Sequence, residues 1–147
     1  MHEVIAVLRR ELTAHDKPEN WVNVQRFFKE KLDRPLVLRA PVFKKISTTG
    51  YAHISHLPKR EILAICDEIL ATEFVHAKGF AFDWARRLEK KLAPSDFARL
   101  ERWLKRQVGN WAQCDSLCCG ALGLLIRDHP QLAARRDRWM HSRNRWV

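Results

Sequence analysis

One carboxylate stands in a nearly apolar stretch of this sequence, and it is the residue best placed to do chemistry. Between Trp111 and Ile126 the single ionisable carboxylate is Asp115. Trp111 lies four residues before it, so the two side chains share one face if the stretch is helical. A charge buried without a partner on so apolar a helix is costly. We therefore expect that Asp115 either has a structural partner or faces a cleft in which a carboxylate is needed.

Three cysteines on the same stretch could in principle hold a metal together with nearby histidines. The candidate ligands are Cys114, Cys118, Cys119, His53, His56 and His76. Their spacing resembles no common zinc pattern, and thiols four residues apart on an apolar helix are usually small core residues. We expect no metal and no cofactor. We also expect no nucleophilic cysteine, because no basic residue lies near Cys118 in sequence. All four cysteines, Cys66 included, are predicted to be reduced thiols of a cytoplasmic protein.

Positive charge dominates the composition. Lys and Arg number 27 against 17 Asp and Glu, so the net charge is +10, which indicates a polyanionic partner, usually nucleic acid. Membranes and acidic proteins remain alternatives. The basic clusters are Arg86, Arg87, Lys90 and Lys91; Arg99, Arg102, Lys105 and Arg106; and Arg135, Arg136, Arg138, Arg143 and Arg145. Any one cluster is better explained as a solvated helix face, but together they favour a phosphate-binding surface.

The elements that must position these residues are predicted to be helices in a single domain. The chain of 147 residues is long enough for its own core, and its five glycines are few. Apolar residues recur mostly at spacings of three and four. No apolar run of eighteen residues and no signal peptide is present. The N-terminal part is predicted to hold helices at His2–His15, through Val24, Phe27, Phe28 and Leu32, and at Pro41–Ile54.

Three prolines mark a repeat in the rest of the chain. Pro58, Pro94 and Pro130 are 36 residues apart, and each opens an amphipathic helix, where proline is tolerated in the first turn. Trp103 and Trp139 occupy the same position in consecutive units. A period in the thirties with paired helices is typical of an α-solenoid. The predicted divisions are N-terminal helices in 1–57 and repeat units at 58–93, 94–129 and 130–147, the last incomplete.

Each complete unit is predicted to contain two helices. They are Lys59–Thr72 with Val75–Leu92, then Ser95–Val108 with Trp111–Asp128. Asn110 is a good N-cap for the last of these, and Gln113 at its third position resembles a capping box. The third unit would begin with a helix from Pro130 to about His141, with a further helix opening at Arg143 behind Ser142. A solenoid normally ends in a capping unit, so an end in mid-repeat is expected of a fragment or a truncated product.

Two spacings in the C-terminal half resemble those of a known family. They are Asn110-Trp111-x-x-x-Asp115 and Trp139-x-x-Ser142-x-x-x-Trp146, which look like the alkylpurine DNA glycosylases built from HEAT-like repeats, the DNA alkylation repair family. The run Val37–Lys45 is more loosely similar to that family's early segment. The resemblance covers most of the chain, and it implies a right-handed α-solenoid of HEAT-like antiparallel helix pairs.

The resemblance also implies an activity and its residues. The reaction is hydrolysis of the N-glycosidic bond of a cationic N3- or N7-alkylated purine in double-stranded DNA, with the lesion still stacked. Trp111 would line the lesion cleft, and Asp115 would be the catalytic carboxylate. A carboxylate stabilises the developing oxocarbenium sugar and orients a water. An indole face attracts cations by roughly 0.5–2 kcal/mol per contact. The expected nucleic-acid contacts are Lys44, Lys45, Lys78, Arg143 and Arg145.

The chain departs from the family's pattern at its end. In the family a pair of arginines follows the residue matched by Trp146, and a further aromatic lies later in the cleft. Those positions fall beyond Val147. We therefore expect this chain to be a glycosylase of this kind or the N-terminal portion of one, and we do not expect the 147 residues to be active alone. The sequence leaves open whether the end at Val147 is natural or a truncation.

Two other functions fit the same features. The first is a basic helical-repeat module that binds DNA without chemistry, which would show salt-sensitive binding and no base release. The second is a helical-repeat scaffold for protein interactions, which failure to bind DNA at low salt would favour. The sequence leaves open the preferred alkyl adduct and the oligomeric state.

Overall fold

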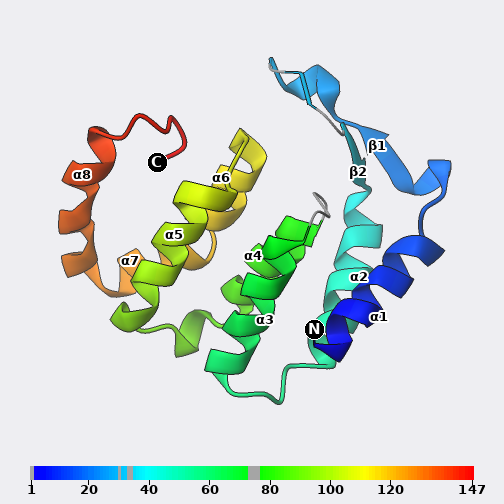
Figure 1. Cartoon of the computed structure of the whole chain (residues 1–147), viewed down its shortest axis with the longest axis horizontal. Coiled ribbons are helices and arrows are strands. Elements are labelled where there is room, and N and C mark those ends of the chain that lie inside the picture. Colours follow the sequence, from blue (N-terminus) through cyan, green and yellow to red (C-terminus); the bar gives the residue numbers. More distant parts are fainter. Residues whose placement is uncertain (1, 30, 33–34, 73–76) are drawn as a thin grey trace.

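Helices make up most of the computed structural model, which describes residues 2–29, 31–32, 35–72 and 77–147 (Figure 1). In chain order they are α1 (Glu3–Ala14), α2 (Ala40–Ala52), α3 (Lys59–Ala71), α4 (Lys78–Arg87), α5 (Phe97–Gln107), α6 (Trp111–Cys118), α7 (Ala121–Asp128) and α8 (Arg136–Met140). Short 3-10 turns are η1 (Pro18–Asn20), η2 (Gln25–Phe27), η4 (Glu89–Lys91), η5 (Pro94–Asp96) and η6 (Pro130–Arg135). Strands β1 (Trp21–Asn23) and β2 (Leu36–Leu38) form a small ribbon. The predicted all-α class is confirmed, with this ribbon as an addition.

Apolar spacing and caps explain the helices that were predicted correctly. In α1, His2 accepts a hydrogen bond from the backbone N–H of Val4 through its ring Nδ1 at 3.3 Å, which satisfies one free donor of the first turn. The buried residues of α1 are Val4, Ile5, Val7 and Leu8, which recur at helical spacing. Helices α2, α3 and α5 likewise agree with the predictions at Pro41–Ile54, Lys59–Thr72 and Ser95–Val108 to within two residues at either end.

The helix predicted through Val24, Phe27, Phe28 and Leu32 is wrong. The chain instead forms the antiparallel ribbon, in which Trp21 lies opposite Leu38 and Asn23 opposite Leu36. Side chains bind the backbone between the strands and compete with helical bonds. Asn23 Oδ1 accepts from the backbone N–H of Gln25 at 3.0 Å, and Gln25 Oε1 accepts from that of Leu32 at 2.8 Å. These bonds fold the segment back on itself.

The single helix predicted from Trp111 to Asp128 is also wrong, because it is interrupted between α6 and α7. Gly120 has ψ −127°, far from the helical value. A Cβ at Gly120 would meet the carbonyl oxygen of Ser116, and one at Gly123 would meet that of Cys118, both closer than real Cβ atoms approach. The break therefore depends on two glycines that let the chain pass close to the end of α6.

The remaining predictions agree only in part. The helix expected at Val75–Leu92 starts as α4 at Lys78 and continues as η4, while positions 75 and 76 lie outside the described residues. The helix from Pro130 is present as η6 followed by α8. No helix follows at Arg143, where Ser142 Oγ accepts from the N–H of Asn144 at 3.1 Å and closes a turn.

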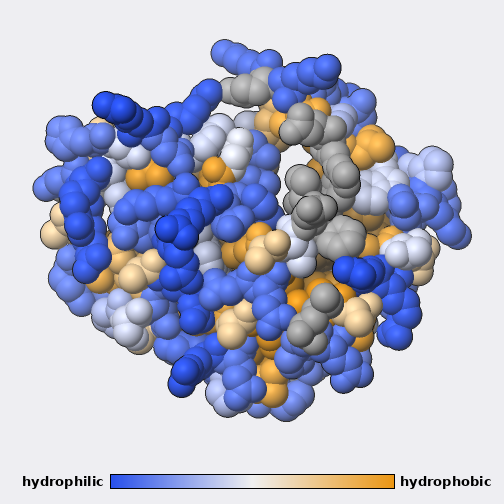
Figure 2. Space-filling model, viewed as in Figure 1, coloured by the Kyte–Doolittle hydropathy of each residue, from blue (hydrophilic) through white to orange (hydrophobic). Residues whose placement is uncertain are grey.

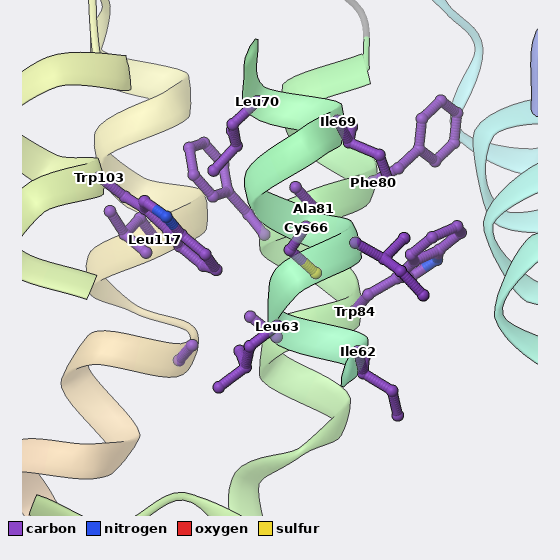
Figure 3. Close-up of a cluster of buried hydrophobic side chains, with 14 of the residues drawn as sticks. Ile62, Leu63, Cys66, Ile69, Leu70, Phe80, Ala81, Trp84, Trp103 and Leu117 are labelled. Carbon is purple, nitrogen blue, oxygen red and sulfur yellow. The ribbon is translucent and has the colours of Figure 1, made fainter. Parts of the chain in front are cut away.

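The core lies between successive pairs of helices. Helix α3 packs against α4, and side chains from both meet Trp103 of α5 and Leu117 of α6 (Figure 3). Consecutive long helices run in alternating directions, so α2, α4 and α6 all begin at the same end of the molecule, where the ribbon also lies (Figure 1). The antiparallel pairing is as expected, while the right-handed solenoid stays a prediction. None of the helices in the described ranges is both long and apolar enough to cross a membrane.

Candidate active site

The start of α6 is held by its own capping residues. Asn110 Oδ1 accepts a hydrogen bond from the backbone N–H of Gln113 at 2.9 Å, as its N-cap role requires. Gln113 Oε1 accepts in return from the N–H of Gly109 at 2.8 Å, one residue earlier than in a standard capping box. Both bonds are local, so residues 109–113 alone determine where the helix begins. Trp111 is consequently its first residue.

Trp111 is half-exposed and is held by the distant ribbon. Its side chain is 44% exposed. The indole Nε1 donates to the carbonyl oxygen of Phe27 at 3.3 Å, across 84 residues of sequence. The ring also stacks on Phe28, with centroids 5.2 Å apart and planes 26° from parallel. One face of the Trp111 indole, which was predicted to be catalytic, is therefore packed against the turn at Phe28. A helix had been predicted for that segment.

Asp115 lies one helical turn after Trp111 and is exposed. Among the residues that the structure describes, no hydrogen bond or ion pair engages its carboxylate. The alternative of a buried, paired carboxylate is thus not what the structure contains. A carboxylate held on a rigid helix beside an aromatic face, with its oxygens free, is suited to interact with a positive charge that comes from outside the protein.

The neighbouring thiols are poor candidates for a metal centre. Cys114 and Cys118 have their sulfurs 3.9 Å apart, and Cys114 also points to the carbonyl oxygen of Trp146 at 3.7 Å. Burial, together with the neighbouring Cys114, Cys119 and Asp115, raises the pKa of Cys118 to about 12. Such a thiol stays protonated at neutral pH and is a weak ligand. In the described ranges no three His, Cys, Asp or Glu residues gather as metal ligands. His76 lies outside those ranges.

The predicted nucleic-acid contacts differ in their surroundings. Lys44 and Lys45 are exposed on α2. Lys78, the first residue of α4, is partly buried, which lowers its pKa, and its Nζ donates to the carbonyl of Gln107 at 2.7 Å. Arg143 and Arg145 are exposed near the end of the chain, and Arg145 lies over the ring of Trp146. Lys78 therefore joins α4 to the end of α5 besides carrying charge.

Many of the other basic residues are used in ion pairs within the protein. Arg99 and Arg102 both approach Asp67 at 3.4 Å. Lys105 pairs with Glu101 at 3.1 Å. Further pairs are Arg87 with Asp83, Lys59 with Asp96, and Arg127 with Glu89 and Asp128. For these residues the solvated helix face is the better explanation, and each exposed pair contributes at most about 1 kcal/mol to stability.

Two of the candidate residues lie at helix starts, at the end of the molecule where the ribbon also lies. Lys78 and Trp111 are the first residues of α4 and α6, which begin at the end of the molecule where the ribbon lies (Figure 1), and Trp111 contacts the turn at Phe27. Helix N-termini carry partial positive charge and attract anions. Figure 2 shows that hydrophilic residues cover most of this face of the molecule, with smaller hydrophobic areas between them. Sequence reasoning missed Phe27 and Phe28 here, although their position in the basic run 26–31 was a usable signal.

Comparison with known protein families gives a match that covers nearly the whole chain. Residues 8–147 match the model of a family described as DNA alkylation repair enzyme, which includes the ribbon and the whole of α6. No curated protein matches the chain in a sequence search.

Proposed function

The chain belongs to the DNA alkylation repair enzyme family, and on that premise we propose that it is a DNA glycosylase, or the N-terminal portion of one. Its substrate would be duplex DNA carrying cationic N3- or N7-alkylated purines. The observation that carries the proposal is the pairing of an exposed carboxylate, Asp115, with the half-exposed indole of Trp111 one turn earlier on the same helix.

The proposed reaction uses these two residues for charge stabilisation. An alkylated purine already carries a positive charge, so the bond from its nitrogen to the sugar C1′ breaks with both electrons leaving on a neutral base. The positive charge then develops on the sugar. Asp115 stabilises that oxocarbenium ion and orients a water, whose oxygen bonds to C1′ as its proton is lost to solvent. Trp111 attracts the cationic base and sugar through its ring face.

The basic residues account for binding to the duplex. Lys44 and Lys45 are exposed and have no acidic neighbour within hydrogen-bond distance in the described residues, so they are available for phosphates. Arg143 and Arg145 add exposed positive charge near the end of the chain. Neutralising phosphates releases counterions, which would make binding strongly dependent on salt. We propose these side chains as backbone contacts that orient the duplex, without a role in base recognition.

The test is release of N7- and N3-methylpurines from alkylated duplex DNA by the intact protein and by Asp115→Asn. We expect the variant to lose about a hundredfold or more in release rate, which is typical for loss of one electrostatic stabiliser of the transition state. Duplex binding should be unchanged or slightly tighter. Asp128→Asn is the matched control, because Asp128 is also exposed but pairs with Arg127. Equal release by Asp115→Asn and the wild type would remove Asp115 from the mechanism.

One observation favours a second candidate, a DNA-binding module without chemistry. Trp111 already has one ring face packed on Phe28, which leaves less of the indole for a substrate. This function predicts salt-dependent duplex binding by the wild type and by Asp115→Asn alike, with no base released by either.

A further inference from the structure

Exposed large hydrophobic side chains gather around the ribbon. In the described residues four such side chains stand out, namely Phe27 at 56%, Leu36 at 47%, Trp111 at 44% and Met140 at 77% exposed. Leu36 belongs to β2, Phe27 to the turn η2, and Trp111 contacts that turn. Only Met140, on α8, lies elsewhere. Exposed apolar side chains that cluster in this way mark interaction surfaces more often than chance positions.

The turn at Phe27 and Phe28 presents its two rings in different ways. Phe28 is partly buried and stacks on Trp111, while the carbonyl of Phe27 accepts the indole N–H. The turn is closed by the bond from the N–H of Phe28 to the carbonyl of Gln25 at 3.0 Å. The backbone of Phe27 is thus tied to α6, whereas its ring projects into solvent. A side chain that is to insert between stacked groups needs an anchored backbone and an exposed ring, and Phe27 has both.

The surroundings of the Phe27 ring are basic. The guanidinium of Arg26 lies 4.7 Å from the ring centre. Lys29 and Lys31 follow in the same segment and are exposed. An aromatic side chain flanked by positive charge fits a duplex, whose phosphates border stacked bases, better than it fits an apolar protein surface.

We propose that the Phe27–Phe28 turn is an aromatic arm that contacts duplex DNA next to Trp111. Phe27 presses against a base step, as the apolar side chains of DNA-bending proteins do. Phe28 acts as a positioning residue that holds the arm on Trp111, and Arg26, Lys29 and Lys31 contact the neighbouring phosphates. The inference rests on the proposed function, since it takes alkylated duplex DNA as the partner, but it concerns binding and deformation of the duplex instead of base release.

The test uses the intact protein and duplexes that carry 2-aminopurine at successive positions, because this base becomes more fluorescent when it is unstacked. We expect the wild type to raise the fluorescence at one base step. Phe27→Ala should lose that signal and bind the duplex about tenfold more weakly, the effect expected when one stacked contact is removed. Phe27→Leu should keep much of both, since leucine is also used as a wedge. Met140→Ala is the control, because it truncates a large hydrophobic side chain on α8 that is even more exposed than Phe27.

The outcomes separate this inference from the proposed activity. If Phe27→Ala matches Met140→Ala in both affinity and fluorescence while the wild type releases alkylpurines, the arm is wrong and the glycosylase stands. If the wild type unstacks one step through Phe27 but releases no base, the arm stands and the glycosylase is wrong. For the positioning role, Phe28→Ala should lower the fluorescence change and Phe28→Tyr should restore it. Equal signals from Phe28→Ala and the wild type would remove Phe28 from the arm.

Discussion

The indole N–H of Trp103 donates a hydrogen bond of 2.6 Å to the carboxylate of Asp67, 36 residues earlier in the chain. Trp139 makes the corresponding bond of 2.7 Å to Glu101. The first bond joins α5 to α3 and the second joins α8 to α5, so each links the first helix of one predicted unit to that of the unit before it. Both indoles therefore have the same structural role at the same repeat position. The divisions at 58–93, 94–129 and 130–147 stay a prediction.

The two indole hydrogen bonds predict how much stability is lost when each tryptophan is replaced by phenylalanine. Trp139→Phe should keep the stacking on Phe97, whose ring centre lies 5.8 Å away, but lose the bond to Glu101. We expect the free energy of unfolding to fall by about 0.5–1.5 kcal/mol, the usual net value of one hydrogen bond. Trp103→Phe should cost more, because Trp103 is buried. Urea unfolding of both variants measures the difference. A Trp139→Phe protein as stable as the wild type would contradict the assigned role.

The hydrogen bond between Trp139 and Glu101 also makes the stability of the protein depend on pH. Burial raises the pKa of Glu101, but the hydrogen bonds from Trp139 and Lys105 and the charges of Lys105 and Arg135 outweigh it, so the pKa lies below its ordinary value of 4.5. A carboxylate with a lowered pKa in the folded state adds stability that is present above 4.5 and is lost as the pH falls through the folded-state pKa. The stability difference between the wild type and Trp139→Phe should shrink over that range. A stability difference that stays constant down to acid pH would show that the Glu101 carboxylate does not account for the contribution of Trp139.

The glycines at the break between α6 and α7 should be far more sensitive to replacement by alanine than a glycine outside it. Gly120→Ala and Gly123→Ala would each place a methyl group against a backbone carbonyl, which has little room to move. We expect each of these two variants to lower the free energy of unfolding by about 1–3 kcal/mol. Gly109→Ala is the control, because its nearest neighbour would be Gln113 Oε1 at 3.7 Å, an ordinary contact. Thermal unfolding of the three variants provides the measurement. Equal effects at all three sites would show that the close approach is not what requires glycine.

The lysines expected to contact DNA should fall into two groups. Some should affect DNA binding alone, and Lys78 should also affect stability. Lys44→Ala with Lys45→Ala should leave stability unchanged and lower the slope of log affinity against log salt by about 0.9 for each lost phosphate contact. Lys78→Met should also lower stability, by about 1 kcal/mol, because it removes the bond to the carbonyl of Gln107. In the control Lys59→Met, the pair with Asp96 is lost and the salt slope should not change. An unchanged slope for the double variant would exclude Lys44 and Lys45 from the interface.

The thiols should react in an order that follows their exposure. Cys119 is exposed, whereas Cys118 is partly buried with its pKa raised to about 12. At pH 8 iodoacetamide should therefore modify Cys119 well before Cys118, because the thiolate is the reactive form. Peptide mass spectrometry identifies the modified site, and Cys119→Ser gives the background. A raised folded-state pKa also means that the contribution of Cys118 to stability is full below pH 9 and declines above it. Faster labelling of Cys118 would contradict its assigned environment.

Local patterns in the sequence were sufficient for most of the helices. The buried side chains of α5, such as Leu100 and Leu104, recur at helical spacing, and the caps of α1 and α6 lie within three residues of the bonds they make. The prediction of Asp115 and Trp111 on one capped helix also required only residues 110–115. Helix formation and capping depend on interactions within one or two turns, so they are visible in the sequence.

The tertiary structure decided the features that depend on residues far apart in sequence. The ribbon requires Trp21 to meet Leu38, and the packing of Phe28 on Trp111 joins segments more than 80 residues apart. Which basic residues remain available for a partner was also not visible, because Arg99 and Arg102 find Asp67 only once α3 and α5 have packed. Spacing in the sequence specifies which side chains share a helix face. Only the packing of those faces specifies which side chains meet, because burial and ion pairing are properties of neighbours in space.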